Sequence, residues 1–599
     1  MYNAIRQLFS LLTPSQYQRF FKLQILVVLM SFLEIVGVTS IIPFMALVGD
    51  MNQLQQDTLI AQLFNASGIK SESEFLFLLG VGVLLMLFIS SLVSMFTIWK
   101  LSMFAHRIGV EIADTLYSHY LKQDWLFHAT GSSAQLTKKV ATEALRVTNG
   151  LVIPIMAMNA RIVFIFFISF TIFIYDPKVA LIGLLVFVTA YLILFKLVRK
   201  RLENNGEAIS IVNEQRFRLM NEGFGGIKDV LLMGRDNDFI NRFSKTGDSF
   251  AYSLGSTETL TQVPRYLIEL IAFGSMISLL LYLIASHDGN LGMILPIMSV
   301  YALATFKLLP ALQQIYRSIG HIKANISAFE SIHQDLKDSS KAEIINAPEK
   351  DNSFFNPKEK ISLENINFTY PGKQESAITN LNLSISANSV VGIVGPSGAG
   401  KSTVVDILLG LIEPQKGELK VDNITINNKN RRSWQNTIGF VAQSIFLSEG
   451  TFAENVAFGI PDDQINLDKV QKALELAHLD ELIKTLKNGI HTKVGERGVQ
   501  LSGGQRQRVG IARALYHEAE VLVFDEATSS LDGITEKMIM ESIDQLSGKK
   551  TIIMIAHRLK TIQNCDEIFF IDNGQIIDHG TYNELLERNE HFKKMADHA

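Results

Sequence analysis

Six long apolar stretches lie in the first half of the chain, separated by polar segments of unequal length. A bilayer core about 30 Å thick requires around 20 helical residues at about 1.5 Å of rise each. Most of the stretches reach that length, so the pattern predicts six membrane-spanning helices. They lie near residues 23–48, 75–99, 151–174, 179–198, 266–286 and 292–309, and the sixth is short unless its helix continues through Pro310.

Basic residues predict the orientation of these helices. The connecting segments 49–74, 175–178 and 287–291 contain only two lysine or arginine residues, Lys70 and Lys178. Residues 100–150 and 199–265, in contrast, are rich in lysine and arginine. Cytoplasmic loops carry the excess of positive charge, so both termini are expected in the cytoplasm. The two basic segments are too long to be turns. They are expected to continue the membrane helices, with residues 75–128 as one helix of about 80 Å.

The apolar excess ends near residue 335, and three regions are predicted: a transmembrane domain over 1–335, a polar linker over 336–358 and an α/β domain over 359–599. With 48% hydrophobic and 19% charged residues and a mean hydropathy of +0.21, the chain is too apolar to face water throughout. The net charge of −4 gives no support for nucleic-acid binding. The single cysteine, Cys565, excludes an intrachain disulfide and a CxxC metal site.

A phosphate-binding loop is predicted directly after the short apolar strand 390–394. Residues 395–403 read GPSGAGKST and lead into an apolar helix, which matches GxxxxGK[ST] in its strand–loop–helix context. The backbone N–H groups of such a loop and the helix N-terminus surround phosphate. A glycine-rich turn without a ligand is the alternative. The nucleotide-binding candidates here are Gly395, Ser397, Gly398, Gly400, Lys401, Ser402 and Thr403, with Ser402 also a Mg²⁺ ligand.

An acidic pair follows a second apolar strand at 521–524. Asp525 is expected to hold Mg²⁺ through water, and Glu526 is expected to polarise the water that attacks the γ-phosphate. An acidic pair that merely begins a surface helix is the alternative. Between the two motifs, residues 501–505 read LSGGQ and open a helix, so Ser502, Gly503, Gly504 and Gln505 are candidates for a second anion site.

With this pentapeptide the sequence resembles the ATP-binding-cassette (ABC) transporters, of which it is the signature. The resemblance implies a role for five more residues. Tyr370 would stack on adenine, Gln443 would be the Q-loop ligand of Mg²⁺ and the catalytic water, and Asp532 would belong to the D-loop. His557 would be the switch histidine that contacts the γ-phosphate, and Glu496 would lie in the coupling X-loop of exporters.

The resemblance covers nearly the whole chain, as in type IV exporter half-transporters. It implies a six-helix, all-α transmembrane domain ahead of one α/β P-loop NTPase domain, in a bacterial inner (cytoplasmic) membrane. ATP would lie between the Lys401 loop of one cassette and the Ser502 loop of another, so a homodimer is expected. ATP hydrolysis would drive alternating access, with Glu526, His557 and Gln443 as the catalytic set.

The cargo is inferred from charged residues within the apolar stretches, because such residues are costly in a bilayer and tend to be functional. Arg265 and Lys307 are the substrate candidates, although Arg265 has Glu269 four residues on as an ion-pair partner, and Lys307 can reach the inner interface. Segments around both resemble PglK-type flippases of lipid-linked oligosaccharides. That resemblance implies a polyprenyl-diphosphate-linked glycan, exported for protein glycosylation. An exporter of a lipid A-like lipid, drug or peptide is the alternative, and an ATP-gated channel or regulator is a third hypothesis.

Overall fold

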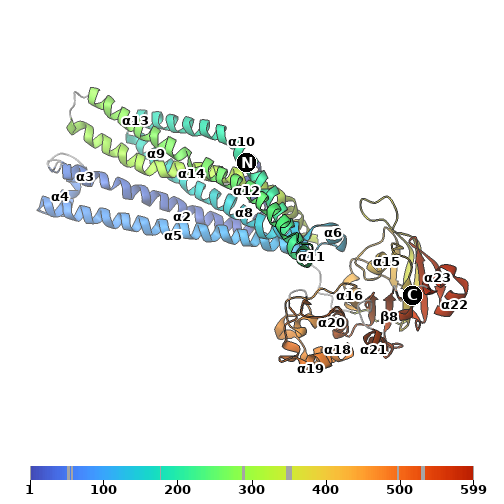
Figure 1. The fold of residues 1–599 in the computed structure, drawn as a ribbon. Helices are drawn as coiled ribbons and strands as arrows, with labels where there is room; N and C mark the ends of the chain where they lie inside the picture. Colours follow the sequence, from blue (N-terminus) through green and yellow to red (C-terminus); the bar gives the residue numbers. More distant parts are fainter. Residues whose placement is uncertain are drawn as a thin grey trace. The chain divides into compact units, whose positions relative to one another are not determined.

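The computed structural model describes residues 2–49, 51, 54, 59–175, 177–286, 291–345, 354–495, 498–527, 533–556 and 558–597. The chain divides into two compact units, Met1–Gln123 with Phe127–Ala347, and Asp124–Leu126 with Pro348–Ala599. The first unit is helical, and the second combines two β-sheets with helices (Figure 1). The predicted fold class, a helical N-terminal domain followed by an α/β domain, is confirmed.

Long helices form the first unit, and several of them run side by side (Figure 1), with α2 against α5 and α14 against both α9 and α10. The long helices are α2 (Pro14–Thr39), α5 (Glu72–Leu121), α9 (Ile153–Tyr175), α10 (Pro177–Gly225), α12 (Asp236–Gln262), α13 (Pro264–Ser286) and α14 (Leu291–Ile345). Short helices are α1 (Tyr2–Ser10), α3 (Ile41–Gly49), α4 (Leu59–Ser67), α6 (Trp125–Thr130), α7 (Ser133–Lys138), α8 (Ala144–Val147) and α11 (Ile227–Leu232), with π-helical turns η2 (Lys139–Glu143) and η3 (Thr148–Val152).

Five of the six predicted apolar stretches fall within continuous helical segments, and the first is divided between two helices. Among the described residues, three helices are long and apolar enough to cross a membrane, over Pro14–Gly37, Glu72–Leu121 and Ser133–Ile174. The first stretch differs from the prediction, because α2 ends at Thr39 and α3 begins at Ile41. Pro43 explains the break, since a proline has no N–H to donate to the carbonyl four residues earlier and its ring crowds that carbonyl.

One predicted helix end is corrected, and one that the sequence left open is established. The helix expected over 75–128 ends at Leu121, and Asp124, a residue type favoured at helix starts, precedes the separate helix α6. The sixth helix continues through Pro310 and runs to Ile345, so α14 has 55 residues and is about 80 Å long. The first ten residues of the predicted linker, 336–345, are therefore helical.

The second unit contains a four-stranded sheet of order β2-β1-β4-β5 and a six-stranded sheet of order β10-β9-β3-β8-β7-β6. In the larger sheet β9, β3, β8, β7 and β6 are parallel, and β10 is antiparallel to β9. The strands are β1 (Lys360–Phe368), β2 (Ile378–Ser386), β3 (Val390–Val394), β4 (Lys416–Val421), β5 (Ile424–Thr425), β6 (Ile438–Val441), β7 (Val521–Asp525), β8 (Thr551–Ile555), β9 (Glu567–Asp572) and β10 (Gln575–Gly580).

Helices cover both faces of the six-stranded sheet, and its strands are buried on both sides because successive side chains point to opposite faces. In β7, Val521 and Val523 join the apolar core that contains α15, whereas Leu522 and Phe524 join the core that contains α20. The helices of this unit are α15 (Lys401–Leu408), α16 (Arg431–Asn436), α17 (Phe452–Val456), α18 (Leu467–Leu476), α19 (Asp480–Thr485), α20 (Gly503–Tyr516), α21 (Gly533–Asp544), α22 (Tyr582–Arg588) and α23 (Glu590–Asp597).

Candidate nucleotide site and membrane-domain cavity

The predicted phosphate-binding loop connects the buried strand β3 to α15. Gly400, the residue before the helix, has φ 100°, a left-handed conformation that glycine adopts without steric cost. Lys401 is buried, and its Nζ donates to the carbonyl oxygens of Gly395 at 2.8 Å and Pro396 at 3.0 Å. Burial lowers the pKa of Lys401, while the carboxylates of Glu526 and Asp525 act in the opposite direction. These two carboxylates therefore lie close enough to act on the Lys401 ammonium.

Tyr370 is held against the helix that follows this loop. Its hydroxyl lies 3.1 Å from the Thr403 Oγ1, and its ring packs edge-on against Phe368 with the centroids 5.0 Å apart. Ser402 is exposed at the start of α15, and Ser397 and Gly398 are exposed in the loop. The structure thus brings the predicted adenine contact and the predicted phosphate contacts to one region.

The acidic pair lies where β7 ends. Asp525 is the last residue of β7, and Glu526 has φ 48°, a left-handed conformation that is uncommon for a non-glycine residue. The Glu526 N–H donates to the Ile555 carbonyl oxygen at 3.1 Å, and the Gln443 Nε2 donates to the Glu526 Oε2 at 2.7 Å. Two predicted site residues that follow different strands, β6 and β7, are therefore in direct contact.

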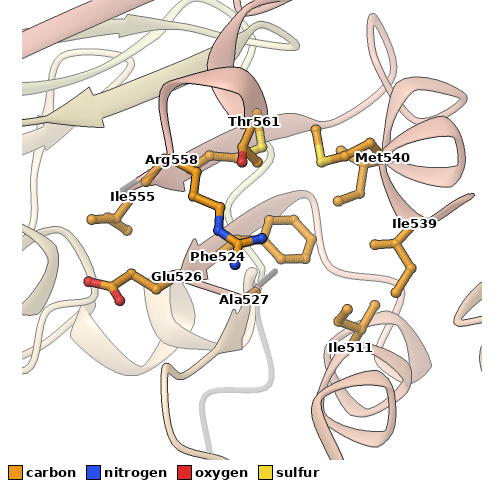
Figure 2. Close-up of a pocket in the computed structure, with 12 residues that line it drawn as sticks. Ile511, Phe524, Glu526, Ala527, Ile539, Met540, Ile555, Arg558 and Thr561 are labelled. Carbon is orange, nitrogen blue, oxygen red and sulfur yellow. The ribbon is translucent and has the colours of Figure 1, made fainter. Parts of the chain in front are cut away.

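A small cavity of about 30 Å³ lies beside Glu526, room for about one water molecule. Figure 2 shows the Glu526 carboxylate directed away from the apolar side chains of Ile539 and Met540 on the opposite side of the cavity. Arg558 also lines the cavity, and its Nη1 donates to the Glu536 Oε2 at 3.3 Å. Since Glu536 also accepts from the Thr561 hydroxyl at 3.1 Å, it anchors the segment directly after residue 557.

The signature residues form the start of α20. Ser502 is the N-cap: its hydroxyl accepts from the Gln505 N–H at 3.2 Å, and its own N–H donates to the Gln505 Oε1 at 2.9 Å. The first N–H groups of a helix, here those of Gly503 and Gly504, have no partner inside the helix. α20 packs on the face of the sheet opposite to α15, so this second anion site is apart from the Lys401 loop within the unit.

Three predicted site residues, Glu496, Asp532 and His557, lie outside the described residues. Several residues near the site were missed in the sequence. Gln507 and Arg558 stand beside motif residues, which is a signal for them. The other missed residues lie in no recognisable motif, and only the fold places them near a site. They are Glu536 in the cassette and Tyr191 and Arg317 in the membrane unit.

The two substrate candidates lie in different surroundings. Arg265 Nε donates to the Glu269 Oε1 at 2.7 Å, and the Gln313 Nε2 donates to the same oxygen at 3.2 Å. Lys307 Nζ lies 3.9 Å from a carboxylate oxygen of Glu34, whose other oxygen lies 3.8 Å from Arg161. Both cations therefore have a carboxylate neighbour, as the ion-pair alternative for Arg265 supposed.

Arg265 also lines a polar cavity of about 270 Å³ in the membrane unit, together with Arg317. The side chains that line it include two guanidinium groups, and each has a carboxylate partner outside the lining: Glu269 for Arg265, and Glu258, at 3.3 Å, for Arg317. The Tyr191 hydroxyl is fully buried there and has no hydrogen-bond partner among the described atoms. The complete set of lining residues is Tyr191, Thr261, Gln262, Arg265, Tyr266, Pro310, Gln313, Gln314, Tyr316 and Arg317, and Lys307 is not among them.

Comparison with known families identifies the class of protein that this fold and site define. Residues 39–308 match the family model "ABC transporter transmembrane region", and residues 378–529 match the family model "ABC transporter". The chain belongs to the ABC transporters, with a transmembrane region followed by an ATP-binding domain. It is an integral membrane protein that binds ATP and couples its hydrolysis to translocation.

Particular relatives narrow the comparison. The chain is 28% identical to the ATP-dependent lipid A-core flippase of Vibrio vulnificus (strain CMCP6) over 551 residues, 90% of this chain and 91% of the relative. It is 27% identical to the flippase of the same name from Escherichia coli (strain K12), over 85% of each chain. A bacterial Atm1-family ABC exporter, solved with ATP bound, has the same fold, with a TM-score of 0.75, 22% identity and coverage of 96% of this chain and 98% of that chain. These relatives do not support the predicted resemblance to lipid-linked oligosaccharide flippases.

Proposed function

We propose that this chain is an ATP-driven flippase for an anionic glycolipid of the lipid A type. The observation that carries the proposal is the polar cavity that Arg265 and Arg317 line. Guanidinium groups recognise phosphate through paired, charge-assisted hydrogen bonds. Gln262, Gln313 and Gln314 add amide groups suited to sugar hydroxyls, and the buried Tyr191 hydroxyl lacks the partner that such a head group would supply. The named activity of the relatives supports the same cargo class.

In the cassette, Glu526 is proposed as the general base that takes a proton from the attacking water. Gln443 orients the carboxylate through its 2.7 Å hydrogen bond, and Lys401 binds the β- and γ-phosphates. Ser402, Asp525 and Gln443 fit Mg²⁺, because hard oxygen ligands suit that ion. Bound there, Mg²⁺ would offset phosphate charge. The described residues contain no cluster of three His, Cys, Asp or Glu side chains, and a Mg²⁺ held mainly by nucleotide phosphates requires none.

The remaining nucleotide contacts are proposed from the family motif: Tyr370 on adenine, the backbone and hydroxyl groups of residues 395–403 on phosphate, and Asp532 and His557 at the γ-phosphate. Glu496 is proposed as the coupling residue. Because α15 and α20 cover opposite faces of the sheet, we infer a homodimer in which the Ser502–Gln505 segment of the partner completes each site. The cassettes then lie in the cytoplasm of a bacterial inner membrane.

A polyprenyl-diphosphate-linked oligosaccharide is the second candidate cargo, since two guanidinium groups also suit a diphosphate. It is the weaker one, because Lys307, which that cargo would need, does not line the cavity.

Proteoliposomes that contain the full chain test the cargo. Fluorescent lipid A, a fluorescent lipid-linked oligosaccharide and an apolar dye are offered separately, and ATP-dependent loss from the accessible leaflet is followed. Lipid A is expected to move, and Arg265→Ala and Arg317→Ala are expected to slow it by about tenfold, the cost of a lost charge-assisted hydrogen bond. Arg235→Ala, which removes an exposed cation at the start of α12, serves as the control. Transport of the oligosaccharide alone, or of the dye alone, would overturn the lipid A assignment.

A further inference from the structure

Gln507 links the signature helix to the proposed catalytic glutamate of the same cassette. The residue is the fifth of α20, and only 2% of its surface is exposed. Its Nε2 donates to the backbone carbonyl oxygen of Glu526 at 3.2 Å. This contact attaches the first turns of α20, which begin with Ser502, to the end of β7.

The backbone of Glu526 requires such support. Its φ of 48° is a left-handed conformation that costs a residue with a side chain about 1–2 kcal/mol. The N–H of Glu526 is held by the Ile555 carbonyl at 3.1 Å, and its C=O is held by Gln507. Since hydrogen bonds fix the residue on both sides, they decide where its carboxylate points.

The same helix also packs on the loop that carries Gln443. At Gly510 of α20, an added Cβ would lie 2.5 Å from the Ile445 Cδ1, so α20 and this loop are in close contact. Near the C-terminal end of α20, Arg513 Nη2 donates to the Phe446 carbonyl at 3.0 Å and Arg513 Nε to the Asn455 carbonyl at 2.9 Å. One rigid helix therefore contacts both the backbone of Glu526 and the loop of its side-chain partner.

We propose that Gln507 is a positioning residue that sets the orientation of the Glu526 carboxylate according to the position of α20. The inference rests on the proposed function, in which Glu526 is the base and the start of α20 binds nucleotide held by a partner cassette. Nucleotide at Ser502 shifts α20, and Gln507 passes the shift to Glu526 of the same chain. The two sites of the dimer then hydrolyse ATP in a coordinated way.

The test compares Gln507→Leu, which keeps the volume and removes the donor, with the matched control Gln435→Leu. Gln435 Nε2 also donates to a backbone carbonyl at 3.2 Å, that of Gly410, away from Glu526. In nanodiscs, kcat of Gln507→Leu is expected to fall by about tenfold or more, as for a mispositioned catalytic group, while KM for ATP and the melting temperature match those of the control. A kcat within twofold of the wild type, or an equal loss in Gln435→Leu, overturns the proposal.

Gln507→Glu adds a second measurement, the pH dependence of kcat, which would not change if Gln507 had only a structural role. A carboxylate repels the Glu526 carbonyl, whereas the protonated acid can donate to it, so the kcat of this variant relative to wild type is expected to rise as the pH falls. A flat ratio overturns the proposal. Glu526→Gln is assayed alongside. If Glu526→Gln hydrolyses ATP at the wild-type rate, the proposed base is wrong; if it is inactive and Gln507→Leu is normal, only the positioning role is wrong.

Discussion

The Nε2 of Gln443 donates to the Oε2 of Glu526 across 2.7 Å, although 83 positions separate the two residues in the sequence. The contact follows from the pairing of β6 with β7, in which Val441 lies opposite Phe524. Parallel strands end at the same edge of a sheet, so the residues that follow them meet there. Motifs that are dispersed along the chain thus become one site.

The first prediction concerns hydrolysis. Glu526→Gln keeps the size of the side chain and an oxygen that can accept from Gln443, but an amide cannot take up the proton of the attacking water. Turnover is therefore expected to fall by about 10²–10⁴-fold, the range of general base catalysis. Phosphate release and binding of a fluorescent ATP analogue are measured in parallel. Nucleotide binding should persist, and hydrolysis close to the wild-type rate would contradict the role of Glu526.

The second prediction concerns a buried charge cluster in the membrane unit. Glu143 is fully buried, and Arg146 Nη1 lies 2.9 Å from it and Lys138 Nζ 3.6 Å from it. Lys138 keeps Glu214 at 3.3 Å, but Glu143→Ala removes the carboxylate partner of the largely buried Arg146. Stability should therefore fall by about 3–5 kcal/mol.

Thermal unfolding in detergent measures this loss, with Asp238→Ala as the control. Asp238 pairs with Arg235 at 3.0 Å, but both side chains are at least 60% exposed, so removing this pair should cost less than about 1 kcal/mol. If the two variants unfold at the same temperature, Glu143 does not stabilise the helix bundle.

The sequence predicted those features that depend on local pattern. The buried strands that deliver Lys401 and Asp525 could be recognised because a short apolar run next to a glycine-rich or acidic motif has few other structures open to it. The Arg265–Glu269 pair could be anticipated because residues four apart share a helix face. The contact from Gln507 to Glu526 could not be anticipated, because it depends on how α20 packs on the sheet. The π-helical turns at Lys139–Glu143 and Thr148–Val152 also lacked a local signal.

The third prediction tests the close packing of two long helices. A Cβ on Gly206 of α10 would lie 2.0 Å from the backbone oxygen of Ala324 in α14, so Gly206→Ala must separate these helices. The expected cost is about 1–3 kcal/mol, as for other overpacked sites. Gly255, in α12, has no atom within 4 Å of its added Cβ, so Gly255→Ala should be stabilising by up to about 1 kcal/mol. Relative to the wild type, the melting temperature is expected to fall for Gly206→Ala and to rise for Gly255→Ala. A higher melting temperature for Gly206→Ala would contradict the close packing of the two helices.

The fourth prediction uses the single cysteine as a reporter of cassette unfolding. Cys565 is buried, and this burial raises the pKa of its thiol from 9.0 to about 12, with smaller contributions from the negative charges of Asp566 and Asp544. The folded state therefore favours the neutral thiol. This contribution to stability is complete below pH 9.0 and is lost as the pH rises from there toward about 12, because the unfolded state releases its proton first. The melting temperature should fall more steeply between pH 9 and 11 for the wild type than for Cys565→Ala.

At pH 8, iodoacetamide should label the thiol only after unfolding, since the thiolate is the nucleophile. Rapid labelling of the folded chain would show that Cys565 is accessible and that its pKa is not raised.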